Sequence, residues 1–188
     1  MAKSLEGLVR LMQYQKLLTE RAIGQIGEEQ VHEVIPGIEH SIAVLMKHIS
    51  GNLYSHWTNF RTEDGEKPWR NREGEFEDTF ADKRELMEHW NRGWGTFFSA
   101  MDSISDDETG SIMYIRNEGH TITEAAMRSL SHISAHTGQI VMIARYFAGD
   151  GWKSLSVPRG KTEEYNRKKF AQDKSIGFYK ERLEETGK

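Results

Sequence analysis

The sequence predicts an all-α protein in which four long helices form a bundle. Apolar residues in long segments of the 188-residue chain recur with the period of an α-helix, about 3.6 residues. Half-buried strands alternate apolar and polar residues, and the chain shows no series of segments with this alternation. The three prolines, at positions 36, 68 and 158, lie between the helical segments and so separate helices instead of interrupting them.

The first two helices are expected at residues 4–24 and 38–61. Both carry their apolar residues on one face, and the first is expected to end at Gly24, since glycine is common where helices stop. Residues 61–80 combine an Asp-Gly turn, a proline and many charged side chains. This composition predicts a long ordered loop, which would cross over between the second and third helices.

The third and fourth helices are expected at residues 82–104 and 122–148. Thr121 or Thr123 can cap the fourth helix, and Gly149 and Gly151 end it. A short strand is expected between these helices, at residues 112–115.

The chain divides into a bundle and an extension. Residues 1–150 are expected to form the four-helix bundle, and residues 151–188 a C-terminal extension. Within the extension, "KTEEYNRKKFAQDK" predicts one short helix, because its polar sequence still has good helix formers.

Composition excludes several classes of function. A hydrophobic content of 37% with 29% charged residues is typical of a globular protein, and the net charge of −4 gives no general attraction to nucleic acid. No apolar run reaches about 18 residues, so no membrane span is expected. The chain has no cysteine, which excludes a thiol nucleophile and a thiolate metal site. A cytoplasmic location is expected.

Two histidines interrupt the apolar pattern of the fourth helix, in "RSLSHISAHTGQIVMIARYF". His132 and His136 are four positions apart, so they project from the same side of the helix and can reach one divalent ion. Ile133 stands where a zinc protease would carry its general base, and this excludes the protease motif. Hydrogen-bonded core histidines and histidines on a solvated flank of the helix are the competing interpretations of the pair.

Polar residues extend this pattern on two helices and suggest where a third ligand lies. One stripe runs along the fourth helix and a similar one along the second: Arg128, His132, His136 and Gln139, then Ser41, His48 and Asn52. Facing helices of a bundle commonly build metal sites. His48 is one candidate for the third nitrogen, but His56 lies nearer the centre of the second helix's apolar face, so periodicity leaves both open.

The segments "MKHISGNLYSHW" and "SHISAHTGQI" together resemble the DinB/YfiT-like superfamily, and "SGNLYSHWTNFRTEDGEKPWRNREGEF" with "SVPRGKTEEYN" resembles a bacterial branch of uncharacterised DinB-like proteins. The resemblance implies a homodimer of four-helix bundles and a divalent ion, zinc or nickel. By motif position the ligands would be His48, His132 and His136. Asn52 and Gln139 would then hydrogen-bond the ligand imidazoles and fix their orientation.

The resemblance implies a metal-dependent enzyme that activates a thiol or water. The leading expectation is a thiol S-transferase, which would take a small-molecule substrate and a low-molecular-weight thiol. The alternatives are a metal-dependent hydrolase, a non-catalytic metal-binding stress-response module and a plain dimeric scaffold. Nucleic acid and membrane are not expected partners.

No general base is evident from the sequence, and the catalytic candidates are Arg128 and His120. Arg128 could bind an anionic substrate group or pair with Glu124 one turn away. Three arginines in the crossover loop, at positions 61, 70 and 72, could also bind such a group. The acidic residues around them favour local ion pairs instead.

Overall fold

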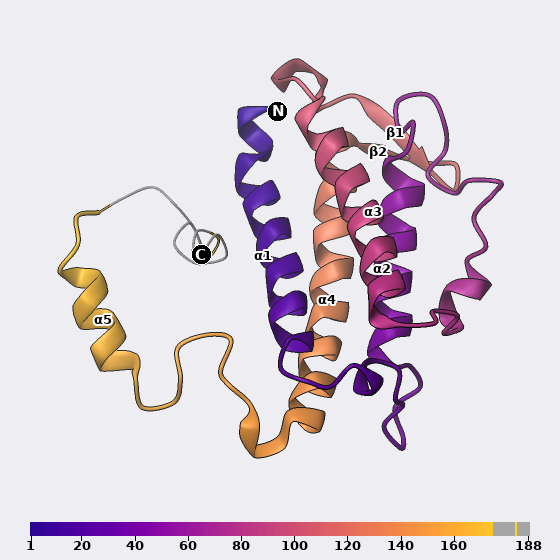
Figure 1. The fold of residues 1–188 in the computed structure, drawn as a ribbon. Coiled ribbons are helices and arrows are strands. Elements are labelled where there is room, and N and C mark those ends of the chain that lie inside the picture. Colours follow the sequence, from indigo (N-terminus) through magenta and orange to yellow (C-terminus); the bar gives the residue numbers. More distant parts are fainter. Residues whose placement is uncertain (175–182, 184–188) are drawn as a thin grey trace.

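The computed structural model describes residues 1–174 and 183, and it confirms an all-α helical bundle with a small two-stranded sheet. Four long helices lie side by side, and a short fifth helix lies outside this group (Figure 1). The helices are α1 (Glu6–Ile23), α2 (Ile42–Trp57), α3 (Lys83–Asp102), α4 (Ile122–Ala148) and α5 (Thr162–Phe170). No helix in this part of the chain combines the length and the apolar character needed to cross a membrane.

The connection between α2 and α3 is the crossover that the sequence predicts. The Ser50 hydroxyl of α2 donates to the His89 carbonyl of α3, and seven residues further along α2 the Trp57 ring packs edge-on against Phe97. The two helices therefore run in the same direction. The chain must return along the whole bundle between them, and it does so through residues 58–82 on one side of the molecule (Figure 1).

Helix α4 has the predicted bounds because both its ends are specified locally. Thr121 caps the first turn, and its hydroxyl and the Glu124 carboxylate form a reciprocal capping box. At the other end Gly149 takes a positive φ of 53°, where a side chain would be strained, and the helix stops. Trp57 donates to the Ser129 hydroxyl, which fixes the register of α4 against α2.

Helix α2 is shorter than predicted at both ends. The expected range was 38–61, but the helix begins at Ile42, with the Ser41 hydroxyl accepting from the Val44 amide. Ser41 is therefore a cap and not part of a polar stripe facing α4. The apolar pattern continues past both ends of the helix, through exposed Ile38 and buried Phe60, although the backbone is no longer helical there.

A hairpin joins α3 to α4 and reaches the crossover. Strand β1 (Ile112–Ile115) lies where the sequence predicts it, and its antiparallel partner β2 (Glu118–Thr121) was not predicted. Arg116 and Asn117 both have positive φ, as the two-residue turn of a hairpin requires. The Asp64 carboxylate of the crossover accepts from both of their backbone amides at 2.8 Å. This contact fixes the hairpin tip beside the crossover.

Gly93 allows α3 to approach α2 closely. A Cβ at this position would lie 2.8 Å from the Cα of Ser50, so the helices would have to separate. We expect Gly93→Ala to lower the free energy of unfolding by about 1–3 kcal/mol. Gly95→Ala is the matched control on the same helix, because a Cβ there meets nothing within 4 Å.

The control should instead raise the free energy of unfolding by about 0.5–1 kcal/mol, since alanine favours the helix. Urea unfolding of both variants measures the difference. Equal effects of the two substitutions would contradict the close approach of the helices at Gly93.

Candidate metal centre

Three histidines from α2 and α4 converge on one point. The Nε2 atom of His132 lies 3.1 Å from Nε2 of His48 and 3.1 Å from Nε2 of His136. One ligand nitrogen from each ring lies within 4.8 Å of the other two. The structure thus brings His48, and not His56, to the histidine pair on α4. This group could hold a metal ion.

The hydrogen bonds on the far side of two rings set their tautomers. Nδ1 of His48 lies 2.9 Å from Oε2 of Glu75, and Nδ1 of His136 lies 2.7 Å from Oε1 of Gln139. Both oxygens are acceptors, so both Nδ1 atoms must carry the proton. In a neutral ring the Nε2 lone pair is then free, and in His48 and His136 it points toward the shared centre.

The pKa values favour neutral rings. Burial, followed by the positive charges that His136, His48 and two arginines can carry, lowers the pKa of His132 to about 3. Burial also lowers the pKa of His136, although its hydrogen bond to Gln139 acts in the opposite direction. These two rings are uncharged at neutral pH and can ligate a cation without first losing a proton.

The spacing of the nitrogens fits a shared ion. Tetrahedral coordination at about 2.1 Å places ligand nitrogens roughly 3.4 Å apart, close to the observed separations. His132 can donate at most one proton to one neighbour, so the remaining lone pairs repel one another unless a cation lies between them. The donor set therefore suits a divalent transition-metal ion, since imidazole binds zinc, nickel, copper and iron.

Glu75 is a site residue whose role the sequence did not reveal. Its carboxylate accepts from His48 and also from Nε and Nη2 of Arg70, at 2.8 and 3.0 Å. The Glu75 and Arg70 side chains are only 8% and 4% exposed. Burial alone would raise the pKa of Glu75, but the hydrogen bonds from His48 and Arg70 outweigh it and lower the pKa. The crossover thus supplies a charged partner that orients His48.

Gly51 makes room for this carboxylate on α2. A Cβ at position 51 would lie 2.8 Å from Cδ of Glu75. Phe76, the next residue of the crossover, stacks on the His48 ring with centroids 5.0 Å apart. A glycine three positions after His48, with an acidic and aromatic pair in the loop, is the sequence signal that could have identified Glu75.

The other predicted site residues lie in different places. Gln139 contacts His136, as described, whereas the hydrogen bond of Asn52 is to His56 at 3.5 Å and not to any of the three clustered rings. Arg128 lines the cleft next to the cluster. His120 is paired with Met113 in the hairpin, and it is not among the described residues that line this cleft.

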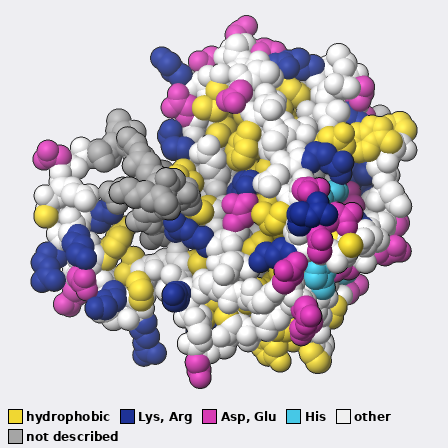
Figure 2. Space-filling model, viewed as in Figure 1, with side chains coloured by type: hydrophobic (Ala, Val, Ile, Leu, Met, Phe, Trp, Pro, Cys, Tyr) yellow, Lys and Arg dark blue, Asp and Glu magenta, His cyan; other side chains and the backbone are white. Residues whose placement is uncertain are grey.

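Two of the three crossover arginines form ion pairs with nearby acidic residues of the loop, as the sequence predicts. Arg70 binds Glu66 and Glu75, and Arg72 lies 3.3 Å from Glu73. Arg61 differs, because its partner is Glu108 beyond the end of α3 and not an acid of the loop. On the side of the molecule away from α5, basic, acidic and histidine side chains gather at the surface (Figure 2).

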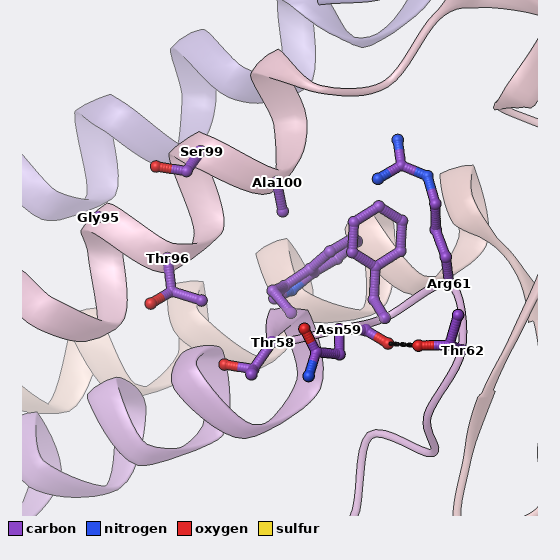
Figure 3. Close-up of a pocket in the computed structure, with 10 residues that line it drawn as sticks. Thr58, Asn59, Arg61, Thr62, Gly95, Thr96, Ser99 and Ala100 are labelled. Carbon is purple, nitrogen blue, oxygen red and sulfur yellow. Dashed lines mark hydrogen bonds between the residues drawn. The ribbon is translucent and has the colours of Figure 1, made fainter.

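A second hollow, larger than the cleft beside the histidine cluster, lies between α2 and α3 and lacks metal-binding side chains among its described lining residues. It has a volume of about 670 Å³ and is formed by the end of α2, the residues that follow it and the second half of α3. Threonine, asparagine and serine side chains project around it, with Arg61 at one end (Figure 3). No histidine or carboxylate stands among its described lining residues. The side chains that could hold a metal ion therefore gather at the histidine cluster and not in this hollow.

His56 is a buried histidine that helps to line the cleft, and it is only 2% exposed. Burial, followed by the charges of Arg70 and Arg128, lowers its pKa from 6.5 to about 3. Between these pH values the unfolded chain binds a proton that the folded chain excludes. The free energy of unfolding therefore falls as the pH drops below 6.5, by up to about 1.4 kcal/mol per pH unit from this residue.

Replacing His56 with glutamine should remove this contribution. We expect the metal-free His56→Gln variant to lose stability less steeply than the wild type between pH 6 and pH 4. Urea unfolding at several pH values measures the two slopes. Identical slopes would show that His56 is not a buried neutral histidine.

Comparison with known proteins gives a family but no named relative. No curated protein matches the chain. The model of the family described as "Protein of unknown function (DUF1572)" matches residues 2–161, which include α1 to α4 and end directly before α5 begins. The match covers far more than half of the 188 residues. The chain therefore belongs to the DUF1572 family.

Proposed function

We propose that the protein is a metal-dependent enzyme in which His48, His132 and His136 hold one zinc or nickel ion, and that it transfers groups to or from a small thiol. The observation that carries the proposal is the convergence of three Nε2 atoms, with the tautomers of two rings fixed from behind. DUF1572 is a DinB-like family, which agrees with the resemblance seen in the sequence. A divalent ion, when bound, supplies positive charge that favours the deprotonated form of a thiol or of water.

The chain's own residues prepare this centre. Glu75 and Gln139 hold the His48 and His136 rings so that their lone pairs face inward. The cluster adjoins a cleft of about 410 Å³ that His48 and His132 help to line, so a substrate can reach one side of the centre. Three protein nitrogens leave coordination positions for it, as in catalytic zinc sites.

The lining of this cleft favours a thiol over water as the activated group. Hydrolases with a metal centre commonly use a carboxylate near the ion as general base. Among the described residues that line the cleft there is no carboxylate, and Glu75 is occupied by His48 and Arg70. A thiol loses its proton far more readily than water, so it needs less help from such a base.

Addition of a thiol to the nickel-loaded protein tests the proposal. The chain contains no cysteine, so any sulfur-to-nickel charge-transfer absorption must come from the added thiol. We expect 2-mercaptoethanol to produce a saturable band, which ethylene glycol should not produce. If the loaded protein shows no band at saturating thiol but hydrolyses p-nitrophenyl acetate, the hydrolase is the better assignment. If the loaded protein shows neither the band nor the hydrolysis, a non-catalytic metal-binding module is the better assignment.

A further inference from the structure

The cleft beside the histidine cluster is strongly basic. Four arginines line it: Arg70, Arg72, Arg116 and Arg128. They come from the crossover, the hairpin tip and α4, which are far apart in the sequence. The remaining described lining residues are histidine, asparagine and serine, and none is acidic. A concave surface lined by charges of one sign concentrates the electrostatic potential within it.

The carboxylates around the cleft neutralise these arginines only in part. Glu75 is committed to Arg70. Glu66 is shared, because the same oxygen lies 3.2 Å from Arg70 and 3.1 Å from Arg116. Arg116 thus shares its carboxylate partner with Arg70, and the Arg116 side chain is 56% exposed.

Arg128 has no carboxylate partner among the residues that the structure describes. Glu124, one turn earlier on α4, is the partner that the sequence offered. Its carboxylate instead accepts from the amide and hydroxyl of Thr121 in the capping box. Arg128 is exposed at the mouth of the cleft, on the same helix and one turn before His132.

His56 adds a second, independent feature to the cleft. It is almost fully buried, yet its Nδ1 atom has no hydrogen-bond partner within the described part of the chain. A buried polar atom left unpaired is costly, and a bound water, ion or ligand group that pairs with it would remove this cost. The neighbouring Asn52 and Ser131 add hydrogen-bonding groups to the same lining.

We infer that this cleft binds an anionic group of the substrate, a carboxylate or a phosphate, and that Arg128 and Arg116 hold it beside the three histidines. The forked guanidinium matches both groups with two parallel hydrogen bonds. An anion seated there places the rest of a small molecule next to Nε2 of His132. Anion binding in the cleft does not depend on the proposed function. The orientation of the rest of the substrate toward the metal centre does rest on the proposed function.

Calorimetric titration of the metal-free protein tests the anion site without involving the metal. Inorganic phosphate and succinate are added separately at constant ionic strength, which distinguishes a phosphate site from a carboxylate site. At least one of them should bind saturably with one site per chain. Arg128→Gln should weaken this binding about tenfold, as expected for loss of a charged hydrogen-bonding partner. Arg128→Lys should weaken it less, since the charge remains.

Arg145→Gln is the matched control, because Arg145 is exposed on the same helix but lies outside the cleft. It should leave anion binding unchanged. The inference is overturned if neither anion binds saturably, or if Arg145→Gln weakens binding as much as Arg128→Gln does. Metal content of the same variants is measured separately. Absence of saturable anion binding in a wild-type protein that binds metal normally would overturn this inference alone, and saturable anion binding by a protein that binds no metal would overturn the proposed function alone.

Discussion

Replacing His132 with alanine is expected to abolish tight binding of zinc or nickel. His132 is the central member of the cluster, since its Nε2 atom lies 3.1 Å from Nε2 of both His48 and His136. Removing partners that only orient ligands lowers metal affinity about 10–100-fold, so loss of a ligand should exceed about a hundredfold. Competition with a chromophoric chelator measures the affinity.

His120→Ala is the control for this experiment. His120 is a half-buried histidine in the hairpin and contributes no nitrogen to the cluster. Its removal should leave one tightly bound ion per chain. Far-UV circular dichroism shows whether the His132→Ala variant keeps its helices. Equal metal affinity of both folded variants would contradict the three-histidine site.

Replacing Glu75 with glutamine is expected to have the second largest effect, on both stability and metal affinity. The substitution leaves the Arg70 guanidinium, 4% exposed, with only the shared carboxylate of Glu66. Breaking a buried ion pair on one side costs about 3–5 kcal/mol, so we expect about 3 kcal/mol of lost unfolding free energy in the metal-free protein. His48 also loses its charged partner, which should weaken metal binding about 10–100-fold.

Glu73→Gln is the matched control in the same segment of the crossover. The Glu73 side chain is 88% exposed, and within the described part of the chain it pairs only with Arg72 on the surface. An exposed pair of this kind contributes about 0–1 kcal/mol, and Glu73 does not contact the cluster. Urea unfolding and the chelator competition are measured on both variants. If Glu75→Gln behaves like Glu73→Gln, the crossover does not support the metal centre.

The sequence predicted those parts of the fold that depend on local signals. Helix α4 begins at a threonine cap with glutamate three positions on, and it ends at a glycine, so its bounds follow from neighbouring residues. Helix α2 was predicted too long because its apolar spacing continues where Ser41 already caps the helix. Strand β2 has little apolar character, and its pairing with β1 depends on a turn with two positive φ angles.

The histidine cluster could be predicted only in part, for a physical reason. His132 and His136 lie one helical turn apart, and helical geometry alone brings them together. The third nitrogen depends on how α2 rotates against α4, which periodicity does not determine, and His56 was equally compatible. Glu75 approaches His48 only because the crossover folds back along the bundle, so its role is a consequence of tertiary structure.

X-ray absorption spectroscopy of the zinc-loaded protein tests the central claim most directly. The account predicts one ion per chain with three imidazole nitrogens at about 2.0–2.1 Å and at least one further light-atom ligand. Addition of 2-mercaptoethanol should replace a light atom with sulfur at about 2.3 Å. A spectrum without imidazole scattering, or a chain that binds no stoichiometric zinc, would contradict the assignment of His48, His132 and His136 as a metal centre.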